Sequence, residues 1–243
     1  MFRLSHSLPL WLLLFFSLGP AVAAAPDSFN RWVPKGWKLI HKASGDLNRD
    51  GVDDMVLVLE NTSPAHFKKK EPGQFGPDTL NVNPRRIVVL LKAPQGFTEV
   101  LRRDDLLPTQ HDENTPCLED PLANGGVSIA RGNLVIELQQ WLSCGSYGVL
   151  GETFTFRLQG SRFQLVGYDR SESSRNIGNR SHTSTNFLTG QRKRTTGAND
   201  FDEKPRKEKV VWQKLPAMPA FFLDDLSLSC DPVDSMQKNH WCR

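Results

Sequence analysis

Long apolar segments, zinc motifs, internal repeats and a strong net charge are all missing from this sequence. Past residues 8–18, no stretch is long and apolar enough for a membrane-spanning helix, which needs about 20 apolar residues. A formal net charge of +3 over 243 residues is too small to predict binding to nucleic acid or to a membrane surface. No Cys-x-x-Cys pair and no His-Glu-x-x-His run occurs, so a zinc hydrolase has no support. The lack of a repeat with a fixed period argues against a complete propeller.

The first 23 residues have the pattern of a secretory signal peptide. Arg3 provides a positive start, residues 8–18 form the apolar run, and Ala21-Val22-Ala23 offers small residues for cleavage. A Gly-Pro pair breaks the run before it can span a membrane, and no Cys follows that could carry a lipid anchor. We therefore expect a mature chain that begins near Ala24 and is periplasmic or secreted. Its net charge is +2, because Arg3 is the one charge lost from +3.

Short runs rich in Val, Ile, Leu, Phe and Thr dominate the mature chain, and Gly, Asn, Asp and Pro separate them, as is typical of β-strands. The expected strands are Trp37–His41, Met55–Glu60, Arg86–Lys92, Phe97–Arg102, Val127–Ala130, Leu134–Trp141, Thr153–Leu158, Phe163–Tyr168, Thr185–Leu188 and Lys209–Lys214. Tight turns between several of them predict antiparallel pairing of neighbours. We expect one all-β domain over residues 24–215, an antiparallel meander of propeller-like or sandwich-like sheets with little helix.

Residues 62–83, 104–126 and 191–209 are expected to be long surface loops. The third begins with Gln191-Arg192-Lys193-Arg194, which could attract an anionic polymer. No aromatic residue interleaves with these cations and acidic residues follow them, so a solvated hairpin tip is the favoured interpretation. Residues 216–243 are expected to form a C-terminal tail, in which Phe221–Leu228 forms a short helix or Ala217–Phe222 docks as extended chain.

The four cysteines all lie in the mature chain, and an even number in an exported protein favours disulfides over free thiols. Three pairings are formally possible. We favour Cys117 with Cys144 and Cys230 with Cys242, because each pair closes a local loop. A zinc site is the alternative, but a single His240 beside Cys242 gives it little support.

The segment Asp46-Leu47-Asn48-Arg49-Asp50-Gly51-Val52-Asp53-Asp54 has the oxygen-ligand pattern of a calcium loop. The predicted ligands are the side chains of Asp46, Asn48, Asp50 and Asp54 and the backbone carbonyl of Val52. Ca²⁺ accepts six to eight oxygens with loose geometry, and its expected role here is structural. The alternative is an Asx-rich turn that needs no ion, because Asn and Asp side chains satisfy turn backbone by themselves.

An EF-hand would place a glutamate at the twelfth loop position, but that position is Leu57, inside an apolar run typical of a strand. A loop followed by a strand resembles the calcium loops of FG-GAP repeats in integrin-like β-propellers, whose G-D-x-N-x-D-G-x-x-D pattern residues 45–54 fit closely. The resemblance implies a metal-stabilised connection between strands.

Further segments, in this order, resemble a family of uncharacterised exported bacterial proteins. They are Asp78–Arg85, Phe154–Arg157, Phe163–Tyr168 and Asn186-Phe187-Leu188-Thr189-Gly190. The resemblance spans most of residues 37–212. It implies a β fold and a periplasmic or secreted location, and it implies no activity.

The sequence thus predicts an exported, non-enzymatic, calcium-stabilised β domain that binds an unidentified ligand or protein of the cell envelope, as a monomer and without nucleic acid. One alternative is a hydrolase that acts on envelope polymers through the carboxylates of His111–Asp120. Another is an immunity or inhibitor protein in which residues 62–83 block the site of a toxin. Carboxylates that converge on a cleft would favour the hydrolase.

Overall fold

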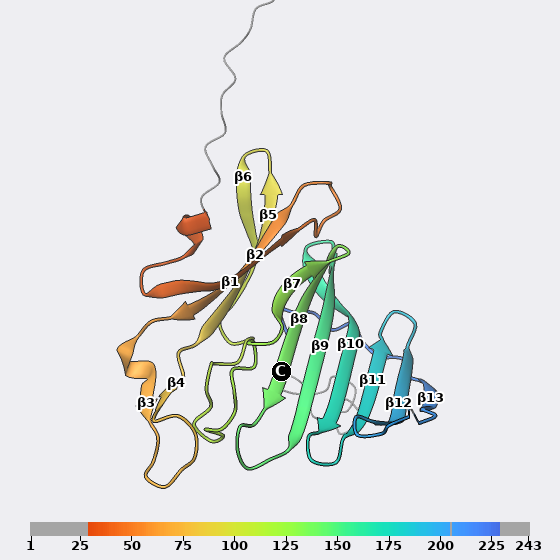
Figure 1. Ribbon diagram of the computed structural model, residues 1–243. Coiled ribbons are helices and arrows are strands. Elements are labelled where there is room, and N and C mark those ends of the chain that lie inside the picture. Colours follow the sequence, from red (N-terminus) through yellow and green to blue (C-terminus); the bar gives the residue numbers. More distant parts are fainter. Residues whose placement is uncertain (1–28, 205, 229–243) are drawn as a thin grey trace, which may run out of the picture.

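The computed structural model describes residues 29–204 and 206–228, and these are almost entirely antiparallel β-structure (Figure 1). The expected all-β antiparallel fold is confirmed. Two sheets share one core, so the fold is sandwich-like. The elements are η1 (Phe29–Trp32), β1 (Trp37–Gly45), β2 (Asp54–Asn61), η2 (Pro64–His66), β3 (Phe67–Lys69), β4 (Thr79–Asn81), β5 (Arg85–Ala93), β6 (Gly96–Arg103), β7 (Gly126–Ala130), β8 (Asn133–Trp141), β9 (Gly148–Gln159), β10 (Arg162–Ser174), β11 (Asn179–Asn186), β12 (Gln191–Asn199) and β13 (Lys209–Lys214).

The smaller main sheet has the strand order β1-β2-β5-β6. Its central strands β2 and β5 are continuous Val and Leu runs, and both of their faces are buried. One face carries Val56 and Val89 into the core between the sheets. The other face carries Leu57 and Leu90, and η1 covers it with Phe29 and neighbouring apolar residues. Burial on both faces explains why these strands show no apolar-polar alternation.

The larger sheet is a meander of seven strands in the order β13-β12-β11-β10-β9-β8-β7 (Figure 1). Strands β7–β10 provide its side of the core, which includes Ile136, Phe154, Leu165 and Tyr168. At one edge, β7 lies against β1 and β2 of the smaller sheet. At the opposite edge, no residue of β11, β12 or β13 belongs to the core cluster. These three strands, called the outer strands below, extend past the sandwich.

The C-terminal segment returns from the outer strands to the core. Phe222 forms a β-bridge with Gln164, and Leu223, Leu226 and Leu228 are buried. No residue of 221–228 is helical, so the expected short helix is wrong. Of the alternative segment Ala217–Phe222, Phe221 and Phe222 dock on β10, whereas Ala217, Pro219 and Ala220 are exposed. Packing of three leucines against the sheet outweighs the weak helical periodicity of the segment. The folded domain therefore continues past residue 215 into the expected tail.

Two of the expected loops contain strands. Residues 62–83 contain η2 and the hairpin β3–β4, and residues 191–199 form strand β12 instead of a solvated hairpin tip. Strand β12 pairs with β11 on one side and β13 on the other, so its backbone is satisfied even though its side chains are polar. Residues 104–125 lack helix and strand, as expected of a loop.

Candidate functional site

The turn between β1 and β2 contains the residues predicted to bind calcium. Both carboxylate oxygens of Asp46 accept hydrogen bonds from the backbone N–H groups of residues 49–51. Asn48 Oδ1 accepts from the backbone of Asp50 at 3.0 Å, and Asp50 Oδ1 accepts from the backbone of Val52 at 2.8 Å. The turn therefore closes through a chain of Asx turns.

Asp54 lies apart from this exposed group because its side chain is fully buried. Its Oδ2 accepts the backbone N–H of Leu47 at 2.7 Å, and its Oδ1 accepts that of Lys92 at 2.9 Å. One carboxylate thus ties the turn to the neighbouring strand β5. This is a structural role that needs no ion.

The fit of calcium to the turn is partial. Asn48 and Asp50 are exposed and Asp46 is half-buried, whereas the side chain of Asp54 is fully buried. Within residues 29–204 and 206–228, no three His, Cys, Asp or Glu side chains lie close enough together to hold a metal ion. Calcium binding here stays a prediction from the sequence pattern, and the hydrogen bonds support the alternative of an Asx-rich turn.

The structure contains the expected disulfide between Cys117 and Cys144, whose Cα atoms are 5.5 Å apart. It joins the loop of residues 104–125 to the end of β8, where Ser143 N donates to the carbonyl of Cys117 at 2.9 Å. The second expected pair, Cys230 and Cys242, lies outside the described residues. So do the residues of the expected signal peptide. No helix of the described chain is long and apolar enough to cross a membrane.

The polar side chains of His111–Asp120 do not converge on one cleft. His111 Nδ1 accepts the backbone N–H of Asn81, and Asp112 Oδ1 caps a turn by accepting two backbone N–H groups. Glu113 and Glu119 are exposed. Of the residues 111–120, only Asp120 lines a polar cavity of about 370 Å³, which it shares with Glu60 and His41 among others. Arg85 donates to both oxygens of Asp120 there, at 2.6 Å.

Arg85 also connects Asp120 to Glu60, and the three form a buried ionic cluster that sequence reasoning missed. Arg85 Nε lies 3.2 Å from Glu60, and both side chains are 3% exposed. Burial alone would raise the pKa of Glu60, but hydrogen bonds from Lys38 and Asn81 and the charge of Arg85 outweigh it and lower that pKa. Every charge in the cluster has a partner, so the cluster anchors the loop to the sheet.

The outer strands carry an excess of positive charge. They carry six Lys and Arg residues and not one Asp or Glu: Arg180, Arg192, Lys193, Arg194, Lys209 and Lys214. Two of the four carboxylates of the β12–β13 connection are used nearby, because Asp200 pairs with Arg180 and Asp202 with Arg206. Asp200 and Asp202 are therefore not the ion-pair partners of Lys193 and Arg194.

Strand β13 adds exposed apolar side chains to this basic surface. All six of its residues are exposed, and Trp212 is 64% accessible. Residues directly opposite each other in an antiparallel pair share a face, so Trp212 stands beside Lys193 and Val211 beside Arg194. The Lys193 ammonium lies 5.9 Å from the Trp212 ring centroid. The sequence appeared to lack an aromatic among these cations, and strand pairing supplies one.

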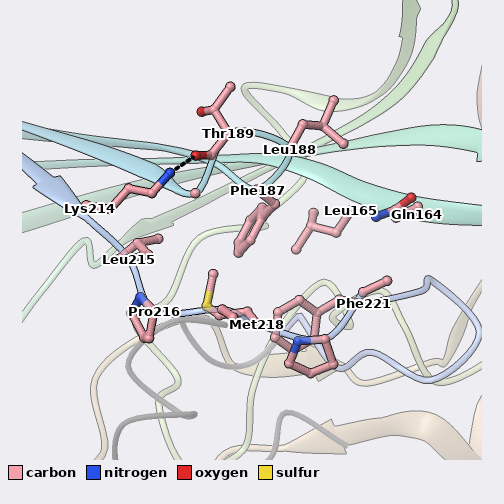
Figure 2. A pocket seen from close by; sticks show the side chains of 14 residues that line it. Gln164, Leu165, Phe187, Leu188, Thr189, Lys214, Leu215, Pro216, Met218 and Phe221 are labelled. Atoms are coloured by element: carbon pink, nitrogen blue, oxygen red, sulfur yellow. Dashed lines mark hydrogen bonds between the residues drawn. The ribbon is translucent and has the colours of Figure 1, made fainter.

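The Asn186-Phe187-Leu188-Thr189-Gly190 motif forms the turn between β11 and β12. Asn186 Oδ1 accepts the backbone N–H of Thr189, and Gly190 has a φ of 62°, which glycine adopts at little cost. Figure 2 shows this turn above a groove of about 460 Å³, with Lys214 bonded to the Thr189 carbonyl. Phe187 packs edge-on against Phe221 across the groove, at 5.7 Å between ring centroids. The motif is thus explained by the hairpin that it closes.

No protein-family model matches the chain, and neither the curated proteins nor the solved structures include a match. The function proposed below accordingly depends on the surfaces and clusters of this chain alone.

Proposed function

We propose that this chain is an exported, non-enzymatic binding protein of the cell envelope, and that the outer strands are its binding surface for an anionic partner. The observation that carries the proposal is a set of six cations and no carboxylate on three strands that contribute nothing to the core. Exposed Trp212 beside Lys193 adds apolar contact area to that charge. Arg180 pairs with Asp200 and Lys214 donates to the Thr189 carbonyl, so Lys193 and Arg194 are the cations proposed to contact the ligand.

Export in this proposal is supported by the N-terminal sequence pattern and by the Cys117–Cys144 disulfide, since disulfides persist in oxidising compartments. A non-enzymatic role is supported by the engagement of the candidate carboxylates: Asp120 by Arg85, and Asp112 by its own turn. Calcium in the Asp46–Asp54 turn belongs to the proposal as a stabilising ion, with weak affinity on the order of 10⁻⁴ to 10⁻³ M because no bidentate Glu is present.

Co-sedimentation of the purified mature protein with isolated cell envelopes tests the proposal. Wild-type protein is expected to sediment with the envelopes and to be released by salt, because exposed charges are screened within about 8 Å at physiological ionic strength. The double variant Lys193→Gln, Arg194→Gln should bind at least tenfold more weakly.

The matched control is Lys68→Gln, Lys69→Gln, which removes two exposed cations from β3. This variant should bind like the wild type. Equal binding by the two double variants, or no binding by the wild type, would overturn the proposal.

A further inference from the structure

We propose that two copies of this chain join edge to edge through β13, in antiparallel register with Val211 of each copy on the two-fold axis. The two seven-stranded sheets then become one continuous sheet. This proposal goes beyond the proposed binding function and does not depend on it.

Among the described residues, the outer edge of β13 presents a row of backbone groups that pair with no other strand. Leu215 N donates to the Gly190 carbonyl at 2.8 Å, so Leu215 and every second residue before it point their backbone groups toward β12. Val210, Trp212 and Lys214 therefore point theirs outward. Within residues 29–204 and 206–228, no strand pairs with this side of β13 (Figure 1).

The usual protection of edge strands is weak on β13. Exposed edges are commonly blocked by bulges, proline or several charges. The edge strand β6 has a register shift beside it and carries Glu99, Arg102 and Arg103. Strand β13 pairs with β12 without a shift, contains no proline, and has Val-Val-Trp at its centre. These three residue types favour strands.

The register follows from the ladder itself, because residues with outward backbone groups must oppose one another. Two centred registers satisfy this rule, with either Val211 or Trp212 on the axis. The Val211 register places Val210 opposite Trp212 of the second copy and the exposed Glu208 opposite its Lys214, each twice. Aromatic with β-branched pairs and opposite charges are both favourable across strands.

The Trp212 register gives up these pairs. It places Lys214 opposite Val210 and Lys209 opposite the buried Leu215, so no opposite charges meet. The Val211 register is therefore the self-complementary one.

Repulsion between the basic outer strands does not prevent this pairing. In the Val211 register, Arg192 and Lys209 of the second copy share a face two strand spacings or about 9.5 Å apart, and the two copies of Arg194 are three spacings or about 14 Å apart. Both separations exceed the screening length of about 8 Å at physiological ionic strength. Edge pairing buries less surface than the roughly 1,600 Å² of a standard interface, so the association is expected to be weak and concentration-dependent.

Sedimentation equilibrium of the purified mature protein over a concentration series tests the pairing. The wild type should shift from monomer to dimer as its concentration rises. Val210→Pro should remove that shift, because it deletes an outward N–H and places a ring at the edge without removing a bond to β12. Val210→Thr, which keeps the N–H and a β-branched side chain, should dimerise like the wild type. A wild type that stays monomeric, or a Val210→Pro variant that dimerises normally, would refute the proposal.

Cross-linking tests the register and remains informative if Val210→Pro fails to fold. Opposed residues that do not exchange hydrogen bonds have Cα atoms about 4.5 Å apart, within the range of a disulfide. Val211→Cys should therefore give a covalent dimer on mild oxidation, identified by mass spectrometry as two linked copies of the peptide 210–214. Gln213→Cys faces Lys209 of the second copy and should give no such link. Linkage at position 213 but not at 211 would disprove the Val211 register.

Discussion

Replacing Arg85 with methionine should destabilise the protein strongly, because Arg85 is the shared partner of two carboxylates. Methionine retains much of the apolar volume of the arginine stem, so the loss measures charge and hydrogen bonding more than packing. Asp120, 25% exposed, would lose Arg85, and Glu60, 3% exposed, would keep Lys38 as its cation, whose own side chain is 55% exposed. Removing one member of a buried ion pair costs about 3 to 5 kcal/mol.

For a domain of this size, each kcal/mol lowers the midpoint of thermal unfolding by about 2 to 4 °C. Arg85→Met should therefore lower the melting temperature by roughly 6 to 20 °C. Urea unfolding with linear extrapolation provides an independent free energy. Hydrogen exchange should also rise in the loop of residues 104–125, since that loop loses its anchor to β5.

The matched control is Arg102→Met on β6, whose partner is Glu99 in an exposed pair. Such pairs contribute about 0 to 1 kcal/mol. A loss below about 1 kcal/mol for Arg85→Met, equal to the control, would refute the conclusion that the cluster is buried and structural. In a double-mutant cycle, Arg85 and Glu60→Gln should be coupled by at least about 0.5 kcal/mol.

Three further predictions follow from the turn, the disulfide and Glu60. Millimolar calcium should raise the melting temperature of the wild type, and Asp50→Ala should abolish that rise. The control Asp53→Ala, which changes an exposed neighbour, should still show the rise. A wild type whose melting temperature does not respond to calcium would exclude the ion. Reducing the Cys117–Cys144 disulfide, whose cysteines are 27 positions apart, should lower the free energy of unfolding by about 3.5 kcal/mol in the chain-entropy model. Urea unfolding with and without reductant measures this loss. An unchanged unfolding midpoint would contradict it. The pKa of Glu60 is lowered below its ordinary 4.5, so its stabilisation is full above pH 4.5 and is lost as the pH falls through the folded-state pKa. Urea unfolding between pH 6 and 3 should show a weaker pH dependence in Glu60→Gln than in wild type, and equal slopes would count against the cluster.

The core strands could be predicted from the sequence because their strand-favouring residues and the turn residues that bound them indicate the same segments. Runs such as Met55–Glu60 contain β-branched and apolar residues and end at turn residues, and the structure extends them by a few positions. Several of the extensions are polar. Strand β10 continues from Tyr168 to Ser174, past the limit of the core, where no apolar pattern marks it.

Strand β12 could not be recognised from the sequence because it, too, lacks an apolar pattern. Both of its faces are accessible, so its side chains show no alternation between apolar and polar. Its strand conformation comes from the neighbours that pair with it. The hydrogen bonds of β11 and β13 reach it from residues that are adjacent only after folding.

The ionic cluster was equally hidden because its members are far apart in the chain. Glu60 ends an apolar run, Arg85 begins another, and Asp120 lies in a long loop. Only the pairing of β2 with β5 brings Glu60 opposite Arg85. The exposed residues of the Asp46–Asp54 turn, in contrast, were found from spacing alone, since their hydrogen bonds are local.

The chain that leaves β13 at Lys214 is held in the core from Leu223 onward. Arg103 donates hydrogen bonds to the carbonyls of Leu223 and Asp224, and Arg162 forms ion pairs with Asp224 and Asp225. A mechanical load on the outer edge of the sheet is therefore transmitted along this connection to the centre of the molecule. A bound partner that pulls on β13 would thus act on a connection whose far end is fixed by the buried Leu223.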